Sequence, residues 1–277
     1  MDTLIKQLFE EIDFDEFKEC EQSALGATSC PQCSSRQYFY GNEIDYTCEQ
    51  KRKLYVLRYL PVHASEISQG IDILKLNGAI RRTLSQNNLA VLSIGGGPGS
   101  DIVGFRDVHR VLHEIRACRE DEPYIADVQY TKIDINRDWN DLFHRVINTR
   151  SDDKPDHINE DYECFYEDVT SINVDIDIQD VILLSYIVSE LTDDEAIVLA
   201  NNIKQWSNEN TIVIVNDRNQ EEVTNRVNSM FKILKTQDAG EFEITGWAGF
   251  VYPDKIRDAC EVTLNRSSLI SYAMGCQ

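Results

Sequence analysis

A glycine-rich turn directly after a short apolar segment constrains the fold of this 277-residue chain more than any other feature. Residues 89–94 read Leu-Ala-Val-Leu-Ser-Ile, and Gly95–Gly99 follow as Gly-Gly-Gly-Pro-Gly. From Ser100 to about Cys118 the apolar residues recur at helical spacing. A strand, a glycine turn and a helix in this order predict the first unit of an open α/β sheet, where ligands bind beyond the carboxyl ends of the strands.

The rest of the carboxyl-terminal part alternates short apolar runs with helical patterns, which is typical of parallel α/β sheets. The final two runs have no obvious crossover helix between them, so we expect the last strand to be antiparallel. The sequence therefore predicts a seven-stranded, Rossmann-like sheet that is mostly parallel. The strands after the first are expected at about 128–135, 163–166, 181–186, 211–216, 242–247 and 269–274.

The amino-terminal part is predicted to be a mostly helical cap. An amphipathic helix is expected over residues 2–20, a second over 50–60 that ends at Pro61, and a third from Ser65 to Lys75 that ends at Asn77-Gly78. We accordingly expect two parts: residues 1–60 as the cap with a cysteine-rich segment, and residues 61–277 as the ligand-binding domain.

Four cysteines lie close together in the cap segment. Cys30 and Cys33 have the Cys-x-x-Cys spacing of a zinc site, and Cys20 and Cys48 are available as further ligands. A second Cys-x-x-Cys pair is missing, so unpaired thiols packed beneath the cap are the other interpretation. No metal is predicted, and both interpretations stay open.

The spacing of the glycines excludes two common nucleotide-binding motifs. The dinucleotide pattern Gly-x-Gly-x-x-Gly requires glycine at position 100 or 102, where Ser100 and Ile102 stand. A phosphate loop ending in Gly-Lys-Ser/Thr is also absent. What remains is Gly-x-Gly-x-Gly at Gly95, Gly97 and Gly99, for which a purely structural turn is the alternative.

The segment Val91–Phe105 resembles motif I of the class I S-adenosylmethionine-dependent methyltransferases. This resemblance implies that Gly95, Gly97 and Gly99 lie beside the amino-acid half of S-adenosyl-L-methionine. Ser93 occupies a position where the family often has an acidic residue.

Further positions follow from the same resemblance. Asp134, at the end of the second strand, is expected to accept both ribose hydroxyls, for which the two oxygens of a carboxylate are suited. Asp168, after the third strand, is expected at the adenine amino group, with Glu167 as the competing candidate. Ser185 is expected beside the cofactor.

The end of the fourth strand is expected to face the substrate. Tyr186 and Glu190 are the candidate catalytic residues, and Glu190 is suited to hold or deprotonate an amine or a hydroxyl. An equally open interpretation is that Ser189 and Glu190 cap the next helix, although Thr192 and Glu195 have the spacing of a capping box.

These features predict a methyltransferase that acts on nitrogen or oxygen of a small-molecule or protein acceptor. A non-catalytic methyltransferase-like binding or scaffold protein and another S-adenosylmethionine-using transferase are the alternatives. The formal net charge of −21 disfavours nucleic acid as a partner. No run approaches the roughly 18 apolar residues of a membrane span, so we expect no membrane partner and a cytoplasmic location. The oligomeric state is left open.

Overall fold

A mixed sheet organises the part of the protein that the structure describes. The computed structural model describes residues 1–12, 32–33, 46–118, 125–149, 157–172, 175–262 and 265–276. The sheet has the strand order β3-β2-β1-β4-β5-β7-β6. Its strands are β1 (Asn88–Ile94), β2 (Ala126–Ile133), β3 (Ile158–Phe165), β4 (Val181–Ser185), β5 (Ile212–Asp217), β6 (Asp238–Trp247) and β7 (Asn265–Met274).

The pairing of the strands confirms the predicted fold class. β1 pairs in parallel with β2 and β4, and the parallel arrangement continues to β3 on one side and β5 on the other. β7 lies between β5 and β6 and is antiparallel to both. The central strands β4 and β5 are buried on both faces, which explains why they read as continuous apolar runs.

Strand β3 begins at Ile158, five residues before its predicted start at Glu163. Its first half, Ile158–Asp161, is polar apart from Ile158, and it pairs in register with Ala126–Gln129 of β2. Because β3 is an edge strand with only alternate residues turned inward, its composition resembles that of a loop.

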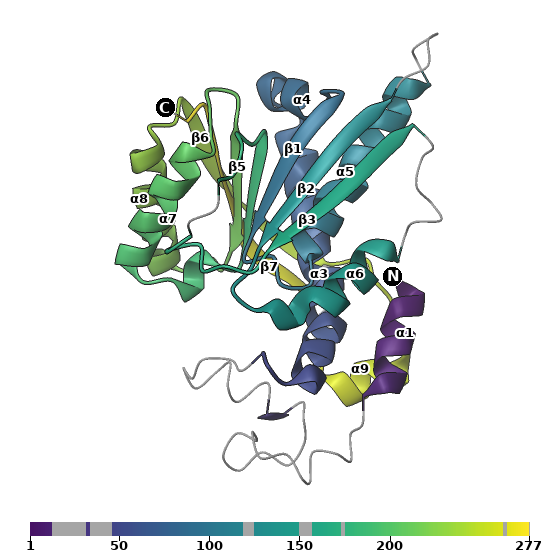
Figure 1. Cartoon of the computed structure of the whole chain (residues 1–277). Coiled ribbons are helices and arrows are strands. Elements are labelled where there is room, and N and C mark those ends of the chain that lie inside the picture. The colour runs from purple at the N-terminus through teal and green to yellow at the C-terminus, as the bar shows by residue number, and fades with distance from the viewer. Residues whose placement is uncertain are drawn as a thin grey trace.

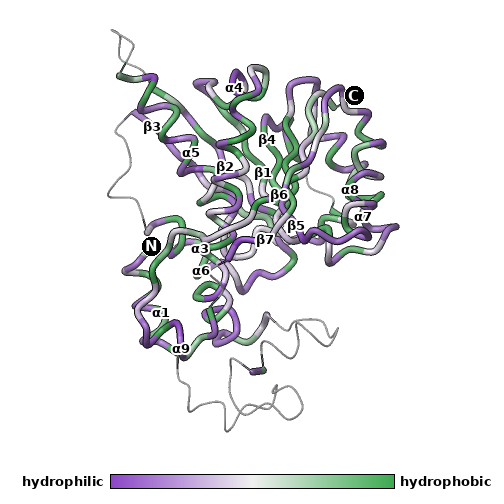
Figure 2. The backbone as a smooth tube through the Cα atoms, turned by 180° about the vertical axis from the view of Figure 1, so that it is seen from behind, coloured by the Kyte–Doolittle hydropathy of each residue, from purple (hydrophilic) through white to green (hydrophobic). Residues whose placement is uncertain are grey.

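Helices cover both faces of the sheet (Figure 1). One face carries α3 (Glu49–Leu74), α4 (Gly78–Leu84), α5 (Ser100–Ala117) and α6 (Asn140–Asn148), and the other carries α7 (Asp193–Gln205) and α8 (Glu221–Leu234). The hydropathy of the backbone follows these layers, with the apolar stretches along the central strands (Figure 2). At the α3–α5 contact a Cβ on Gly104 would lie 2.3 Å from the Ala64 carbonyl oxygen, so only glycine permits this approach.

Helix α3 is continuous through Pro61. We expected two helices separated at this proline, so that prediction was wrong. Proline has no N–H to donate to the carbonyl four residues earlier, which here belongs to Leu57. The hydroxyl of Tyr252 donates to that carbonyl oxygen in its place. The expected division between residues 60 and 61 therefore falls inside a helix.

Two other helix ends also differ from the prediction. Asn77 begins a helix that we did not expect, α4, because its side chain accepts the N–H of Ala79 as an N-cap. Helix α1 (Asp2–Glu11) ends at Glu11, where Ile12 adopts an extended conformation, whereas we expected it to reach residue 20; residues 13–20 lie outside the described ranges.

Besides the two hydrophobic clusters that lie on the faces of the sheet, another cluster joins α1, the first half of α3 and α9 (Asp254–Cys260) below the sheet (Figure 1). Along the sequence, helix α9 follows β6 and precedes β7, and it was not predicted. Arg58 of α3 fixes it by donating to the Cys260 carbonyl oxygen at 2.6 Å and to Glu261 at 3.0 Å. This cluster thus joins segments from both ends of the chain. Among the described residues, no helix has the length and apolarity that crossing a membrane requires.

Candidate functional site

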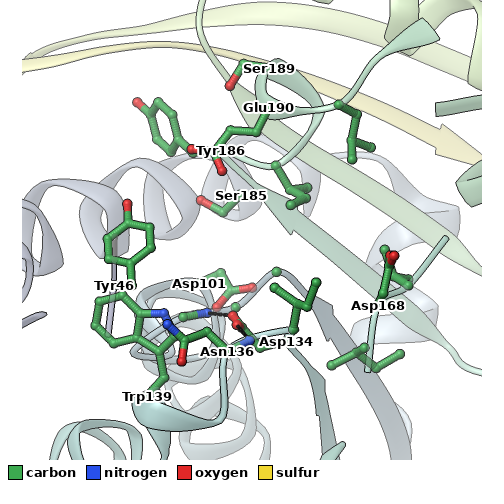
Figure 3. A pocket seen from close by; sticks show the side chains of 18 of the residues that line it. Tyr46, Asp101, Asp134, Asn136, Trp139, Asp168, Ser185, Tyr186, Ser189 and Glu190 are labelled. Atoms are coloured by element: carbon green, nitrogen blue, oxygen red, sulfur yellow. Dashed lines mark hydrogen bonds between the residues drawn. The ribbon is translucent and has the colours of Figure 1, made fainter. Parts of the chain in front are cut away.

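A pocket of about 690 Å³ opens at the carboxyl ends of β1, β2, β4 and β5. Its volume lies within the range of roughly 300–1,000 Å³ that is usual for small-molecule sites. Seven of the eight residues that the sequence predicts for the site line it, and Figure 3 shows five of them as labelled side chains. The seven are Gly95, Gly97, Asp134, Asp168, Ser185, Tyr186 and Glu190.

The glycine turn forms the floor of this pocket. Gly95 and Gly97 have φ angles of +63° and +46°, which L side chains rarely adopt. A Cβ on Gly95 would lie 2.8 Å from the Ile187 side chain, so the turn can pass close beneath the pocket only as glycine. Gly99, at φ +84°, does not line the pocket and instead forms the N-cap of α5 against Phe143.

Asp134 is held against the glycine turn. Its Oδ2 accepts the Gly97 N–H at 2.7 Å, and its Oδ1 accepts the Asn136 N–H at 2.9 Å. Burial raises the pKa of this carboxyl group, which nearby Lys132 partly opposes. Each carboxylate oxygen has a second lone pair, so Asp134 can accept two further donors from a ligand.

Lys132 supports the turn from behind, and the sequence analysis did not identify it. Its side chain is fully buried, and its Nζ donates to the Gly97 carbonyl oxygen at 2.9 Å and lies 4.5 Å from the Phe143 ring centroid. Burial lowers the pKa of this amine. Strand β2 also contains Asp127, Gln129 and Thr131, so nothing in its sequence distinguished Lys132 as a buried residue.

Asp168 and Glu167 both line the pocket. Asp168 Oδ1 accepts the backbone N–H of Thr170 at 2.8 Å and its hydroxyl at 2.7 Å, which fixes the loop after β3. Since neither carboxylate is excluded from the pocket, the choice between them stays open.

Tyr186 presents its ring to the pocket but directs its hydroxyl elsewhere. The hydroxyl donates to Glu66 Oε2 at 3.0 Å, and the ring stacks on His63 with the centroids 4.1 Å apart. Tyr186 itself has a φ of +57° at the end of β4. Glu66 and His63 both belong to α3, and the sequence analysis identified neither.

Glu66 joins four elements beneath the pocket. It is 1% exposed, and it also accepts Asn216 Nδ2 at 3.2 Å and the Ser267 N–H at 3.3 Å. Burial raises its pKa. Asn216 in turn donates to Ser185 Oγ at 3.3 Å, so the buried carboxylate sets the position of both Tyr186 and Ser185.

Glu190 is a further carboxylate that lines the pocket, at the end of β4 (Figure 3). It ends the 3-10 turn Val188–Glu190 and is exposed to the open pocket, yet the surrounding protein raises its pKa, mainly through desolvation. The expected capping box is confirmed at Thr192 and Glu195, whose side chains reciprocally accept backbone N–H groups. The alternative that Ser189 and Glu190 cap α7 is therefore wrong, because Thr192 is its N-cap.

The amino-terminal part of the chain supplies one wall of the pocket. Tyr46 and Tyr55 line it together with Trp139, and their ring centroids lie between 5.1 and 5.7 Å apart. Trp139 belongs to the 3-10 turn Arg137–Trp139 before α6. The pocket thus lies between the carboxyl ends of the strands and these three aromatic side chains.

Of the four cysteines considered as zinc ligands, Cys20 and Cys30 lie outside the described residues. Cys33 is buried and Cys48 is half-buried. Within the described ranges, no group of three or more His, Cys, Asp or Glu side chains is placed to hold a metal ion.

The strand order, with an antiparallel β7, gives the chain a class I S-adenosylmethionine-dependent methyltransferase-like fold. The chain matches no protein-family model and no curated protein sequence.

Solved structures with a similar backbone share little sequence with this chain. A S-adenosylmethionine-dependent methyltransferase from Leishmania major is 10% identical, with a TM-score of 0.46 over 76% of this chain and 72% of that one. A precorrin-6y C5,15-methyltransferase from Geobacter metallireducens is 9% identical, with a TM-score of 0.43 over 70% and 86%. A precorrin 8w decarboxylase from Methanobacterium thermoautotrophicum is 12% identical, with a TM-score of 0.43 over 74% and 89%.

Proposed function

We propose that this protein binds S-adenosyl-L-methionine in the pocket and transfers its methyl group to nitrogen or oxygen of a small-molecule or protein acceptor. The observation that carries the proposal is the pairing of Asp134 with Gly97 on the pocket floor, at the carboxyl ends of the first two strands. There, a buried carboxylate suited to a vicinal diol lies beside a backbone that can pass directly under a ligand.

The residues that line the pocket offer a group for each part of such a ligand. Gly95 and Gly97 would lie beside the amino-acid half, Asp134 would accept the ribose hydroxyls, and Asp168 or Glu167 would accept the adenine amino group. Lys132 keeps the turn in place from behind. The volume of about 690 Å³ lies in the usual range of small-molecule sites.

The acceptor is proposed to lie between the end of β4 and the cap. The bound cofactor supplies an electrophilic methyl group, so the protein mainly has to align the nucleophile and exclude water. Glu190, with its raised pKa, is suited to hold the acceptor amine or hydroxyl and to take its proton. Tyr186 is proposed to act through its ring, since its hydroxyl is bonded to Glu66.

The test measures S-adenosylhomocysteine formed from S-adenosylmethionine in the presence of panels of small amines, alcohols and peptides. We expect turnover with one acceptor class, and Glu190→Gln should reduce turnover while S-adenosylhomocysteine binding is retained. Binding without turnover across all panels would favour a non-catalytic binding protein. Consumption of the cofactor without methyl transfer would favour another transferase.

A further inference from the structure

Asp101 is a buried carboxylate that lines the pocket and that has no part in the binding site proposed above. It is the second residue of α5, directly after the glycine turn, and it is 1% exposed although it lines the pocket. In the view of Figure 3, Asp168, Asp134 and Asp101 follow one another across the pocket.

The orientation of this carboxylate is fixed by hydrogen bonds. Oδ2 accepts the hydroxyl of Ser93 at 2.6 Å, and Oδ1 accepts the Ile102 N–H at 2.9 Å. Ser93 is itself fully buried in β1. Each oxygen of Asp101 keeps a lone pair for one more donor, because a carboxylate offers about four acceptor positions.

Among the described residues, the charge of Asp101 has no close counterpart. Within the described part of the chain, no Lys or Arg forms a salt bridge with it, and Lys132 attracts it only from a distance. An ionised carboxylate that is removed from water is costly unless it is paired. Burial accordingly raises the pKa of Asp101 to about 6. A cationic ligand group would remove this cost.

We propose that Asp101, oriented by Ser93, binds the ammonium group at the amino-acid end of the ligand. This inference rests on the proposed function, which places that end of S-adenosylmethionine beside Gly95 and Gly97. The ammonium group has three N–H donors and no acceptor, so it complements a fixed carboxylate and would be repelled by a basic side chain.

Two ligands separate this role from a structural one. S-adenosylhomocysteine carries the ammonium group, whereas 5′-methylthioadenosine has the same nucleoside and thioether without the amino-acid end. Asp101→Asn keeps the size of the side chain and a hydrogen-bonding partner for Ser93. We expect its Kd for S-adenosylhomocysteine, measured by isothermal titration calorimetry, to rise on the order of 10- to 100-fold, the range for losing a hydrogen bond to a charged group.

The Kd of the same variant for 5′-methylthioadenosine should remain within about twofold of the wild-type value, since only the ammonium contact is lost. Glu114→Gln is the matched control, because Glu114 is an exposed carboxylate on the same helix and does not line the pocket. An equal loss of both ligands in Asp101→Asn would overturn the proposal and assign Asp101 a structural role. Unchanged binding of both would also overturn it.

A measurement on the wild-type protein covers the case in which the variant does not fold. At pH 6 part of the Asp101 population is protonated, and binding an ammonium group should expel that proton. Titrations in two buffers of different ionisation enthalpy should show proton release with S-adenosylhomocysteine and less with 5′-methylthioadenosine. Equal release would contradict the assignment. Failure of the wild-type protein to bind either ligand would instead reject the proposed function itself.

Discussion

The hydrogen bond from Tyr252 to the Leu57 carbonyl group should be worth more than an ordinary one, because Pro61 leaves that carbonyl without its helical donor. Leu57 is fully buried and Tyr252 is 5% exposed, so water is not available as a substitute. Tyr252→Phe should therefore lower the free energy of unfolding by about 1–3 kcal/mol, the cost of leaving a buried polar group unpaired.

A double-mutant cycle tests the reason for this loss. Pro61→Ala restores a backbone N–H that can donate to Leu57, so Tyr252→Phe should cost about 1–2 kcal/mol less in the Pro61→Ala background than in the wild type. Urea denaturation gives the four free energies, and each kcal/mol should also appear as a shift of roughly 2–4 °C in Tm. The same cost in both backgrounds would refute the idea that Tyr252 compensates for the proline.

Three further outcomes are expected. His63 and His109 are buried with their pKa values lowered to about 3, mainly by desolvation, so they stay neutral in the folded protein while the unfolded chain takes up protons below about pH 6.5. The free energy of unfolding should thus fall as the pH falls from about 6.5 toward 3, by about 2 kcal/mol for each histidine at pH 5. In urea titrations, the stability of His109→Phe should depend less steeply on pH than that of the wild type. An unchanged pH dependence in this variant would contradict the prediction. Lys132→Met should raise the Kd for S-adenosylhomocysteine in calorimetry, because the Gly97 carbonyl loses its donor; wild-type affinity would show that the turn does not need the lysine. With a net charge of −21, the protein should give no gel shift with RNA or duplex DNA at micromolar concentration near physiological salt; a shift would revive a nucleic-acid acceptor.

The central sheet could be predicted from the sequence because its signals are local. The glycine turn between β1 and α5, the apolar runs of β4 and β5 and the capping box at Thr192 each lie within a few residues. Since parallel strands end at the same edge of a sheet, residues that follow them, such as Asp134 and Glu190, were expected near one another.

What escaped prediction depends on contacts between distant parts of the chain. The continuity of α3 through Pro61 depends on Tyr252, which lies 195 positions from Leu57. The partner of the Tyr186 hydroxyl, Glu66, lies 120 positions away. Helix α9 is only seven residues long and is held by Arg58 of α3, so its own sequence carries little signal. No periodicity within a single segment reveals such contacts.

The most direct test of the account is calorimetric titration of the protein with S-adenosylhomocysteine, with Asp134→Ala and Asp127→Ala as a matched pair. Asp127 is an exposed carboxylate near the start of the same strand, away from the pocket. We predict binding at one site in the wild type, a loss on the order of 1–3 kcal/mol in Asp134→Ala, and no change in Asp127→Ala. Absence of binding by the wild-type protein, or equal affinity in Asp134→Ala, would contradict the assignment of this pocket to S-adenosylmethionine.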